Sequence, residues 1–382
     1  MKVLLLLLLL LLIQLSNIIT AEVDLTTYYK QFVKENGYTL EEHEVTTEDG
    51  YILSVWHILP KSLAKRVAYF QHGLSDTAWC FFQLGSKSLP FLLLREGYEV
   101  WLGNGRGNVF SNKHVSKNPN DSNSGFYEFS IDDNVKNDLP AIFKYIYSKT
   151  QGKKMSYIAH SQGSTIFFML YMHNPTLVEY YIDHFSSIGT VPNIAHAVFG
   201  PIKLLDTIYG LFDILKFKKG MLVLNNSQRL HFSNFCKTMP FVCKKFFDSG
   251  ASIKPTGRFD YSRLYNFLYY YPGGTNKNTL LQWSQIHTSK QLVYFNPNYN
   301  KEKTATPYNI NNLKNWKIKA LLARTDMDTF SSYEDVTELY NIVEDKSVMK
   351  LLDITNYGHL DVLSADSAYE DIFLSIVKFL RE

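Results

Sequence analysis

Cysteine is scarce in this chain, which has three among its 382 residues. The sequence contains no CxxC pair and no HExxH motif, so it offers no recognised set of metal ligands, and we expect neither a metal ion nor a cofactor. In an oxidising compartment Cys236 and Cys243 are close enough in sequence to form a disulfide. That pairing would leave Cys80 as a free, buried thiol.

Charge of one sign is also scarce. The formal net charge is +3 and no long basic run occurs, so the charge pattern typical of a nucleic-acid-binding protein is missing. No internal repeat and no proline- or glycine-rich linker divides the chain, which favours one integrated unit. Apolar surface, in contrast, is plentiful, since 46% of the residues are hydrophobic and 15% are aromatic. This composition allows a large core and an apolar binding surface as well.

The only long apolar run lies at the amino terminus. Residues 3–13 are almost entirely apolar, one cation (Lys2) precedes them, and the small residue Ala21 follows. This pattern predicts a secretory signal peptide over residues 1–21. The alternative is an uncleaved anchor, but the apolar core is shorter than the ~20 residues that a membrane span needs. We therefore expect a mature chain without a transmembrane segment.

A chain in the secretory pathway would meet the glycosylation machinery. Asn120 and Asn225 each begin an Asn-x-Ser sequon, so both are candidate glycosylation sites. The sequence leaves open whether the protein is secreted or delivered to a lysosome or vacuole.

Strand-like and helical runs alternate over most of the chain. A hairpin is predicted at residues 38–60, strands at 67–71, 98–102, 155–159, 318–323 and 349–354, and helices at 89–95, 132–148, 165–172, 334–343 and 367–380. This order predicts an α/β fold, with a mostly parallel sheet and helices on both faces. The alternation lapses over residues 186–312, where apolar and aromatic residues occupy more faces than a surface helix needs. We therefore expect a core in two parts, residues 22–185 and 313–382, separated by a mainly helical cap.

The segment "YIAHSQGST", residues 157–165, places Ser161 between a predicted strand and a predicted helix. A nucleophile elbow needs this context, with small residues two before and two after the serine, and Ala159 and Gly163 meet that demand. The turn would lift the hydroxyl above the sheet, beside a helix N-terminus that favours developing negative charge. The alternative is an ordinary serine that caps the helix.

A catalytic serine needs a base that an acid orients. In an α/β-hydrolase these residues follow the serine in the order acid, then histidine. His359 lies in the turn after the late strand of "LLDITNYGHLD" and is the candidate base. Asp326 and Asp328 both follow the preceding strand in "KIKALLARTDMDTF", and local spacing does not separate them.

An oxyanion hole needs two backbone N–H donors. Gln162, directly after the serine, is one candidate. Leu74 is the other, because it follows the early strand "VAYFQ" and Gly73 would let the backbone approach a substrate. An ordinary turn at the end of that strand is the alternative.

Several motifs, in their order along the chain, resemble the acid lipase family, which contains lysosomal acid lipase and gastric lipase. They are "QHGLSDTAWC", "GYEVWLGNGRGN", "FYEFSIDDNVKNDLPA", "HSQGST", "QWSQ" and "GHLD". The resemblance implies an α/β-hydrolase fold with a large cap, and hydrolysis of neutral lipid esters without a metal or cofactor. Position by position it implies Ser161 as nucleophile, His359 as base, Asp328 rather than Asp326 as acid, Leu74 and Gln162 as oxyanion donors, and Cys236 paired with Cys243 in the cap. One departure is Ala159, where the family's elbow usually has glycine.

These observations predict a lipase that acts on triacylglycerol, steryl esters or both, at a lipid–water interface, through an acyl-enzyme. The alternatives are a carboxylesterase for shorter soluble esters, a lipid acyltransferase, and a non-catalytic lipid-binding protein on the same fold. The apolar cap segments "TIYGLFDILKF" and "LYNFLYYYP" are expected to line an acyl tunnel in part and to pack the cap's own core for the most part.

Overall fold

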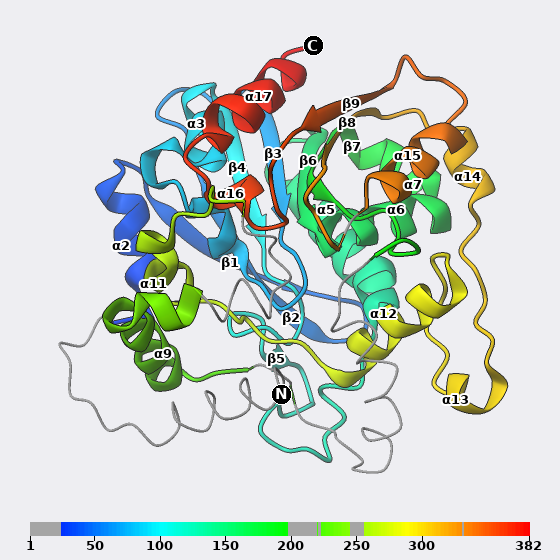
Figure 1. Cartoon of the computed structure of the whole chain (residues 1–382), viewed down its shortest axis with the longest axis horizontal. Helices are drawn as coiled ribbons and strands as arrows, with labels where there is room; N and C mark the ends of the chain where they lie inside the picture. The colour runs from blue at the N-terminus through cyan, green and yellow to red at the C-terminus, as the bar shows by residue number, and fades with distance from the viewer. Residues whose placement is uncertain (1–23, 198–219, 221–222, 245–255, 331) are drawn as a thin grey trace.

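The computed structural model describes residues 24–197, 220, 223–244, 256–330 and 332–382 (Figure 1). The signal peptide prediction, residues 1–21, therefore lies outside the described residues. The strands are β1 (Leu40–Thr46), β2 (Tyr51–Ile58), β3 (Arg66–Gln71), β4 (Tyr98–Gly103), β5 (Lys113–His114), β6 (Met155–Ser161), β7 (Ile182–Thr190), β8 (Lys319–Thr325) and β9 (Met349–Ile354).

These strands form one mixed sheet. Its order is β1-β2-β4-β3-β6-β7-β8-β9, with the short β5 paired to β2. The β1–β2 and β2–β4 pairs are antiparallel, and every pair from β4 to β9 is parallel. The mostly parallel sheet expected from the sequence is confirmed.

Strand β3 is buried on both faces, so its residues from Val67 to Phe70 are apolar without a break. In β3, Val67 and Tyr69 belong to the core on one face of the sheet, whereas Ala68 and Phe70 belong to the core on the other. This division follows from the two-residue period of a strand.

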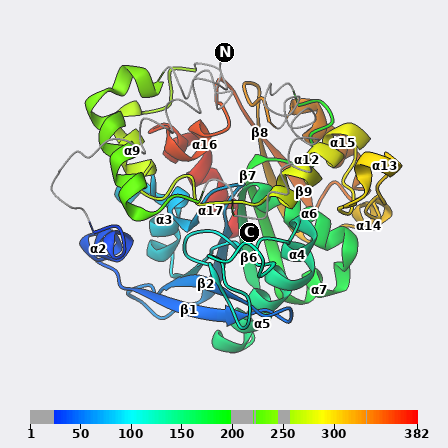
Figure 2. The same ribbon diagram turned by 90° about the horizontal axis from the view of Figure 1, so that it is seen from below.

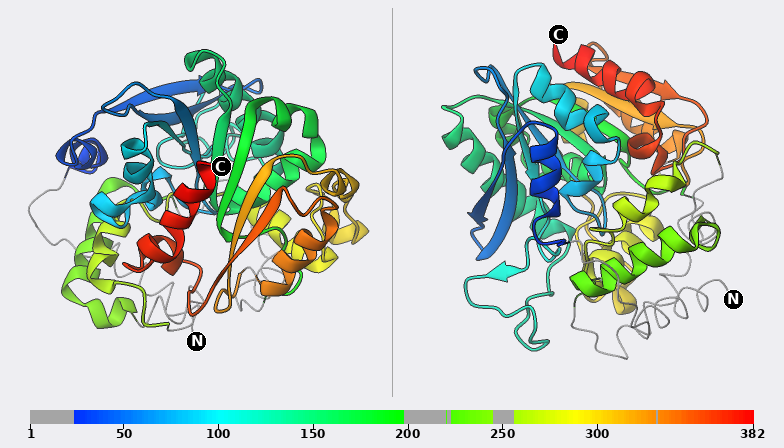
Figure 3. Two further views of the ribbon diagram at one scale, coloured as in Figure 1. Left: turned by 90° about the horizontal axis from the view of Figure 1, so that it is seen from above. Right: turned by 90° about the vertical axis from the view of Figure 1, so that its left-hand side faces the viewer.

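Helices cover both faces of the twisted sheet (Figure 3). They are α2 (Tyr28–Glu35), α3 (Leu89–Arg95), α4 (Ile131–Asp133), α5 (Leu139–Lys149), α6 (Gln162–His173), α7 (Pro175–Tyr181), α15 (Tyr333–Ile342), α16 (Asp361–Ser364) and α17 (Leu374–Leu380). Residues of α5, α6, α7 and α15 pack in one core, and residues of α2, α3, α16 and α17 pack in the other.

The helix predicted at residues 132–148 is continuous but not uniform. A π-helical segment, η3 (Asn134–Asp138), lies between α4 and α5. Pro140 follows in the first turn of α5 and lacks the N–H that would continue the α-helical ladder. The final predicted helix likewise begins with a π-helical segment, η5 (Tyr369–Phe373), before α17.

Strand β7 was not predicted from the sequence. This strand extends four residues past position 186, where the cap was expected to begin. Its sequence IDHFSSIGT lacks a continuous apolar run, because Ser186 and Ser187 occupy its centre. Both serines are nonetheless fully buried, since their small side chains fit between the sheet and the helices that cover it.

The chain between β7 and β8 gathers at one end of the molecule, where Figure 2 shows α9 on one side and α12 and α13 on the other. Its described helices are α9 (Asn226–Thr238), η4 (Tyr261–Arg263), α11 (Leu264–Phe267), α12 (Lys277–Ser289), α13 (Tyr299–Glu302) and α14 (Asn311–Lys314). The segment "TIYGLFDILKF" lies outside the described residues.

The described part of this region has its own small core. Leu264, Phe267 and Leu268 pack there with Cys236 and Cys243. These cysteines form the expected disulfide, and Cys80 is a buried free thiol. Among the helices that the structure describes, none combines the length and apolar character needed to cross a lipid bilayer.

Candidate active site

Ser161 stands at the junction of β6 and α6 with a left-handed backbone. Its φ is +53° and its ψ is −125°, a conformation that costs free energy for any residue with a side chain. A β-carbon added at Gly163 would lie 2.3 Å from the carbonyl oxygen of Gln71. Only glycine fits at position 163, because the turn presses against the backbone after β3. Ala159, the other small position of the elbow, is fully buried within β6.

His359 joins Ser161 to an aspartate. The Ser161 hydroxyl donates to His359 Nε2 over 2.8 Å, and His359 Nδ1 donates to Asp328 Oδ2 over 2.6 Å. His359 and Asp328 are 6% and 8% exposed, so little solvent competes for this hydrogen bond. The three residues come from the carboxyl ends of β6, β8 and β9, which parallel strands bring to the same edge of the sheet.

The two candidate acids have different contacts. The second oxygen of Asp328, Oδ1, accepts from the backbone N–H of Phe330 at 2.8 Å, which turns the other oxygen toward His359. Asp326 is exposed, and its Oδ1 accepts instead from the backbone N–H of Asn356. The structure therefore brings Asp328 to the histidine and leaves Asp326 in a contact between two loops.

The loop after β3 lies against the serine. A β-carbon at Gly73 would come within 2.8 Å of Ser161 Cβ and 3.3 Å of its Oγ. The backbone at position 73, directly before the candidate donor Leu74, therefore lies close to the reacting group. Gln162 is the first residue of α6, and its side-chain oxygen accepts from Trp283 Nε1 of α12 at 2.7 Å. Helix α12 thus contacts the residue that follows the serine.

Three further residues support His359, and sequence reasoning missed all of them. His160 Nε2 donates to the carbonyl oxygen of His359 at 3.2 Å. Gly189, with φ +58°, lets the end of β7 pass close to both histidines. The Phe330 ring packs on His359 with 4.9 Å between the ring centres. For His160 the only signal was its place inside the serine motif.

Burial changes the pKa values of several groups near the site. It lowers the pKa of His160 to about 3 and that of His72 to about 4. His72 Nε2 accepts from the N–H of Gly105, and its Nδ1 donates to the Gly73 carbonyl. The neutral ring therefore fixes the loop after β3 against Gly105. Burial raises the pKa of Asp76, two residues after Leu74, to about 7.

The candidate glycosylation sites lie on the surface. Asn120 and Asn225 are both exposed. The Asn225 side chain also caps α9, where its Oδ1 accepts from the N–H of Gln228. Its Nδ2 remains the atom to which a glycan would attach.

The sequence of this chain is similar to one family model and to several known proteins. Residues 29–85 match the family model described as a partial α/β-hydrolase lipase region. The gastric triacylglycerol lipase of Rattus norvegicus is 31% identical over 380 residues, which covers 92% of this chain and 91% of the relative. Lipase member K of Homo sapiens is 30% identical over 378 residues, with 92% and 90% covered.

Solved structures share the fold. An esterase from Exiguobacterium antarcticum superimposes with a TM-score of 0.52 at 12% identity, covering 90% of this chain and 100% of the esterase. At that identity the likeness supports the α/β-hydrolase fold alone. The sequence relatives support family membership as well as the fold, because they match along about nine-tenths of the chain. The chain therefore belongs to the acid lipase family of α/β-hydrolases, and it is a lipase.

Proposed function

We propose that this lipase hydrolyses long-chain esters of neutral lipids, such as triacylglycerol or steryl esters, with Ser161 as nucleophile, His359 as general base and Asp328 as its orienting acid. The single observation that carries the proposal is the hydrogen-bonded chain from Ser161 through His359 to Asp328. These three groups provide a nucleophile, a proton acceptor and a carboxylate that stabilises the imidazolium.

The mechanism has two acyl-transfer steps. His359 takes the Ser161 proton as Oγ attacks the ester carbonyl, and the backbone N–H groups of Leu74 and Gln162 hold the oxyanion. His359 then returns the proton to the leaving alcohol. A water molecule, activated by the same histidine, attacks the acyl-enzyme and releases the fatty acid.

Two observations support a long-chain lipid substrate. The relatives named gastric triacylglycerol lipase match more than nine-tenths of this chain. The apolar region between β7 and β8 lies over the carboxyl ends of the strands, where Trp283 contacts the residue after the serine. Such a cover suits an apolar acyl chain better than a small soluble ester.

Chain-length preference tests the substrate class. The mature protein would be assayed on emulsified triolein, emulsified cholesteryl oleate and a soluble acetyl ester, with products identified by mass spectrometry. We expect kcat/KM on at least one emulsified long-chain ester to exceed that on the acetyl ester. A clear preference for the acetyl ester would indicate a carboxylesterase. Acyl transfer to an added alcohol in preference to water would indicate an acyltransferase.

We also infer that the chain enters the secretory pathway through the signal peptide at residues 1–21, and is then secreted or delivered to lysosomes. The apolar run at residues 3–13 and the disulfide between Cys236 and Cys243 support this assignment. Amino-terminal sequencing of the protein from eukaryotic cells should give Glu22 as its first residue. A mature chain that retains residues 1–21 would contradict it.

A further inference from the structure

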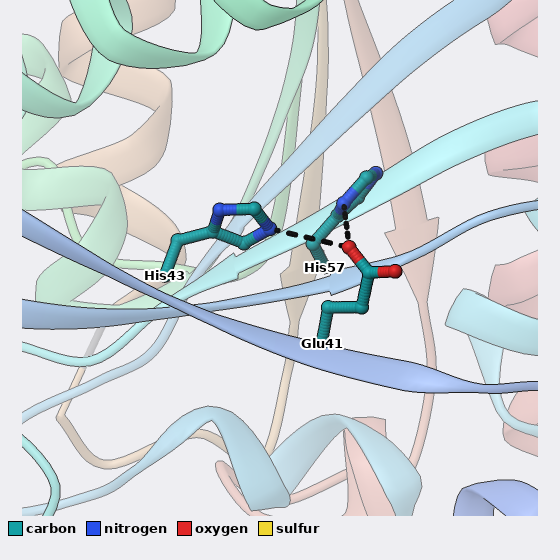
Figure 4. A group of neighbouring side chains, drawn as sticks. All are labelled: Glu41, His43 and His57. Carbon is teal, nitrogen blue, oxygen red and sulfur yellow. Dashed lines mark ion pairs between the residues drawn. The ribbon is translucent and has the colours of Figure 1, made fainter.

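Three side chains of metal-ligating type meet on the edge hairpin of the sheet, away from the active site (Figure 4). Glu41 and His43 lie on β1 and His57 lies on β2. Glu41 and His43 are two residues apart and so share a face of the strand. The strand register pairs Glu41 directly with His57. The hairpin therefore brings all three side chains together.

The ligating atoms of this group are close to the spacing that a zinc ion requires. Glu41 Oε2 lies 3.7 Å from His43 Nε2 and 3.7 Å from His57 Nδ1, and the three atoms lie within 4.8 Å of one another. Tetrahedral zinc with bonds of about 2.0–2.2 Å separates its ligand atoms by roughly 3.4 Å. Small rotations of the long, solvent-exposed Glu41 side chain would shorten the two 3.7 Å distances to the separation that zinc requires.

Both imidazoles present a buried nitrogen to this position. The His57 side chain is 9% exposed. Among the described residues, His57 Nδ1 and His43 Nε2 have no hydrogen-bond partner. A buried polar atom left unpaired costs about 1–3 kcal/mol, so native structures seldom retain one without a compensating ligand. A cation between the two rings would satisfy both nitrogens.

The other nitrogen of each ring has an oxygen nearby. His57 Nε2 lies 2.9 Å from Glu99 Oε1 on β4, although this contact does not have hydrogen-bond geometry, and His43 Nδ1 lies 3.0 Å from the Tyr145 hydroxyl on α5. The Trp101 ring stacks on His57 with 3.8 Å between ring centres. Ligating histidines typically have such a carboxylate or oxygen partner on the far nitrogen, because it fixes the ring and its tautomer.

The group is also open to solvent. A hollow of about 270 Å³ adjoins it, lined by Glu41 and His57 together with Gly37, Tyr38, Thr39, Leu59 and Lys61. This hollow gives an ion a path of entry and leaves room for water as a fourth ligand. The carboxylates of Glu41 and Glu99 together match the charge of a divalent cation.

We propose that Glu41, His43 and His57 bind a divalent transition-metal ion, with zinc the best match to two imidazoles and one carboxylate. The ion bridges β1 and β2 and stabilises the edge of the sheet. The site takes no part in the proposed hydrolysis, because Ser161 and His359 lie at the carboxyl ends of β6 and β9.

The structure holds one other group of this kind, His196, Asp335 and Glu338, within the described residues. It fits a metal less well. Asp335 already accepts from the N–H groups of Ala195 and His196, from Ser332 Oγ and from His196 Nδ1. Its role as a local cap explains its position without an ion.

Zinc binding by the full mature protein tests the proposal. Untagged, chelator-treated protein would be titrated with ZnCl2 by calorimetry, and its Tm measured with and without zinc. We expect one zinc ion per chain and a higher Tm in its presence. Glu41→Gln and His43→Gln should each weaken zinc binding at least tenfold and remove the Tm shift.

The matched control is Glu44→Gln, an exposed carboxylate on the same strand that pairs with Lys113. It should bind zinc as the wild type does, and so should His196→Ala. Circular dichroism would establish that each variant is folded. The proposal is overturned if the folded wild type takes up no zinc, if Glu41→Gln and Glu44→Gln bind equally well, or if only His196→Ala loses binding.

Discussion

At the scale of single residues, the orientation of His359 depends on which aspartate contacts it. Asp326 and Asp328 both follow β8 at positions that suit the acid, so local sequence leaves the choice open. The loop's path decides the geometry, because the N–H of Phe330 holds one oxygen of Asp328 and the other faces His359 Nδ1. Asp326 contacts the backbone of Asn356 instead.

The first prediction compares these two residues. Asp328→Asn should lower kcat by a factor on the order of 10⁴, because an amide favours the wrong imidazole tautomer and leaves the imidazolium unpaired. Asp326→Asn should stay within about threefold of the wild type, since the amide oxygen of asparagine can still accept from the N–H of Asn356 and only the charge of this contact is lost. Initial rates on an ester emulsion, with Tm as a check on folding, distinguish the two. The reverse ranking would assign the acid to Asp326.

Buried titratable groups beside the serine couple stability to pH. The pKa of His160, about 3, and that of His72, about 4, lie below the usual 6.5, so the unfolded chain takes up protons first as pH falls. Their contribution to the free energy of unfolding declines as pH drops below about 6.5. The contribution of Asp76 to stability changes with pH in the opposite direction. Its pKa is about 7 in the fold, against the usual 3.8, so the folded chain keeps a proton that the unfolded chain releases.

The second prediction isolates the Asp76 contribution. Because stability from a raised carboxyl pKa is lost as pH rises through about 7, the wild type is penalised at pH 8 relative to pH 4.5. Asp76→Asn carries no such titration. Its Tm relative to the wild type should therefore move in its favour from pH 4.5 to pH 8. A Tm difference that stays constant across this range would show that Asp76 is not buried as described.

At the scale of elements, the serine turn is held from two sides. The backbone after β3 presses on Gly163 on one side, and Trp283 of α12, in the chain between β7 and β8, donates to the Gln162 side chain on the other. The "QWSQ" motif has a second role. Gln282 Oε1 accepts from the N–H of Ile131, and its Nε2 donates to Asp132. One turn of α12 therefore joins the chain between β7 and β8 to both α4 and α6.

The third prediction concerns this contact. Trp283→Phe keeps an aromatic ring but removes the hydrogen bond to Gln162. A neutral hydrogen bond is worth about 1 kcal/mol, so kcat should fall roughly fivefold with KM unchanged, if the contact positions the proposed oxyanion donor. Trp316→Phe is the matched control, because it loses the bond from Nε1 to the Ile318 carbonyl far from the serine.

Steady-state kinetics of the two variants on one ester separate positioning from packing. Trp316→Phe should lower the Tm and leave kcat near the wild-type value. An equal loss of kcat in both variants would contradict a positioning role for Trp283 and indicate a general effect on the fold.

Comparison at this scale also shows what the sequence could predict. The strand–serine–helix segment was predicted from its local pattern. His359 was predicted because parallel strands bring turns that are far apart in the sequence to the same edge of the sheet. Strand β7 was missed because Ser186 and Ser187 break its apolar pattern. Trp283 was recognised only as part of a motif, since its partner Gln162 is 121 positions away, and contacts of that separation leave no local periodicity.

At the scale of the whole molecule, several family motifs hold the chain together outside the reaction. Buried Arg106, from "GNGRGN", pairs with Asp138 of η3 and with Asp49 in the hairpin turn, each at 2.6 Å. It links the loop after β4 to two distant segments. Asp132 accepts from Gln282 and from the Tyr308 hydroxyl, which connects the helices beside the sheet to the chain that returns to β8.

We propose that one serine on this scaffold, Ser161, performs the ester hydrolysis. Fatty-acid release from emulsified long-chain triacylglycerol or cholesteryl ester, measured from pH 4 to pH 8 for the mature wild type beside Ser161→Ala, tests this role. We expect release by the wild type and a loss of at least ~10⁴-fold in kcat for the folded variant. Ester hydrolysis by Ser161→Ala at a rate near that of the wild type would contradict it.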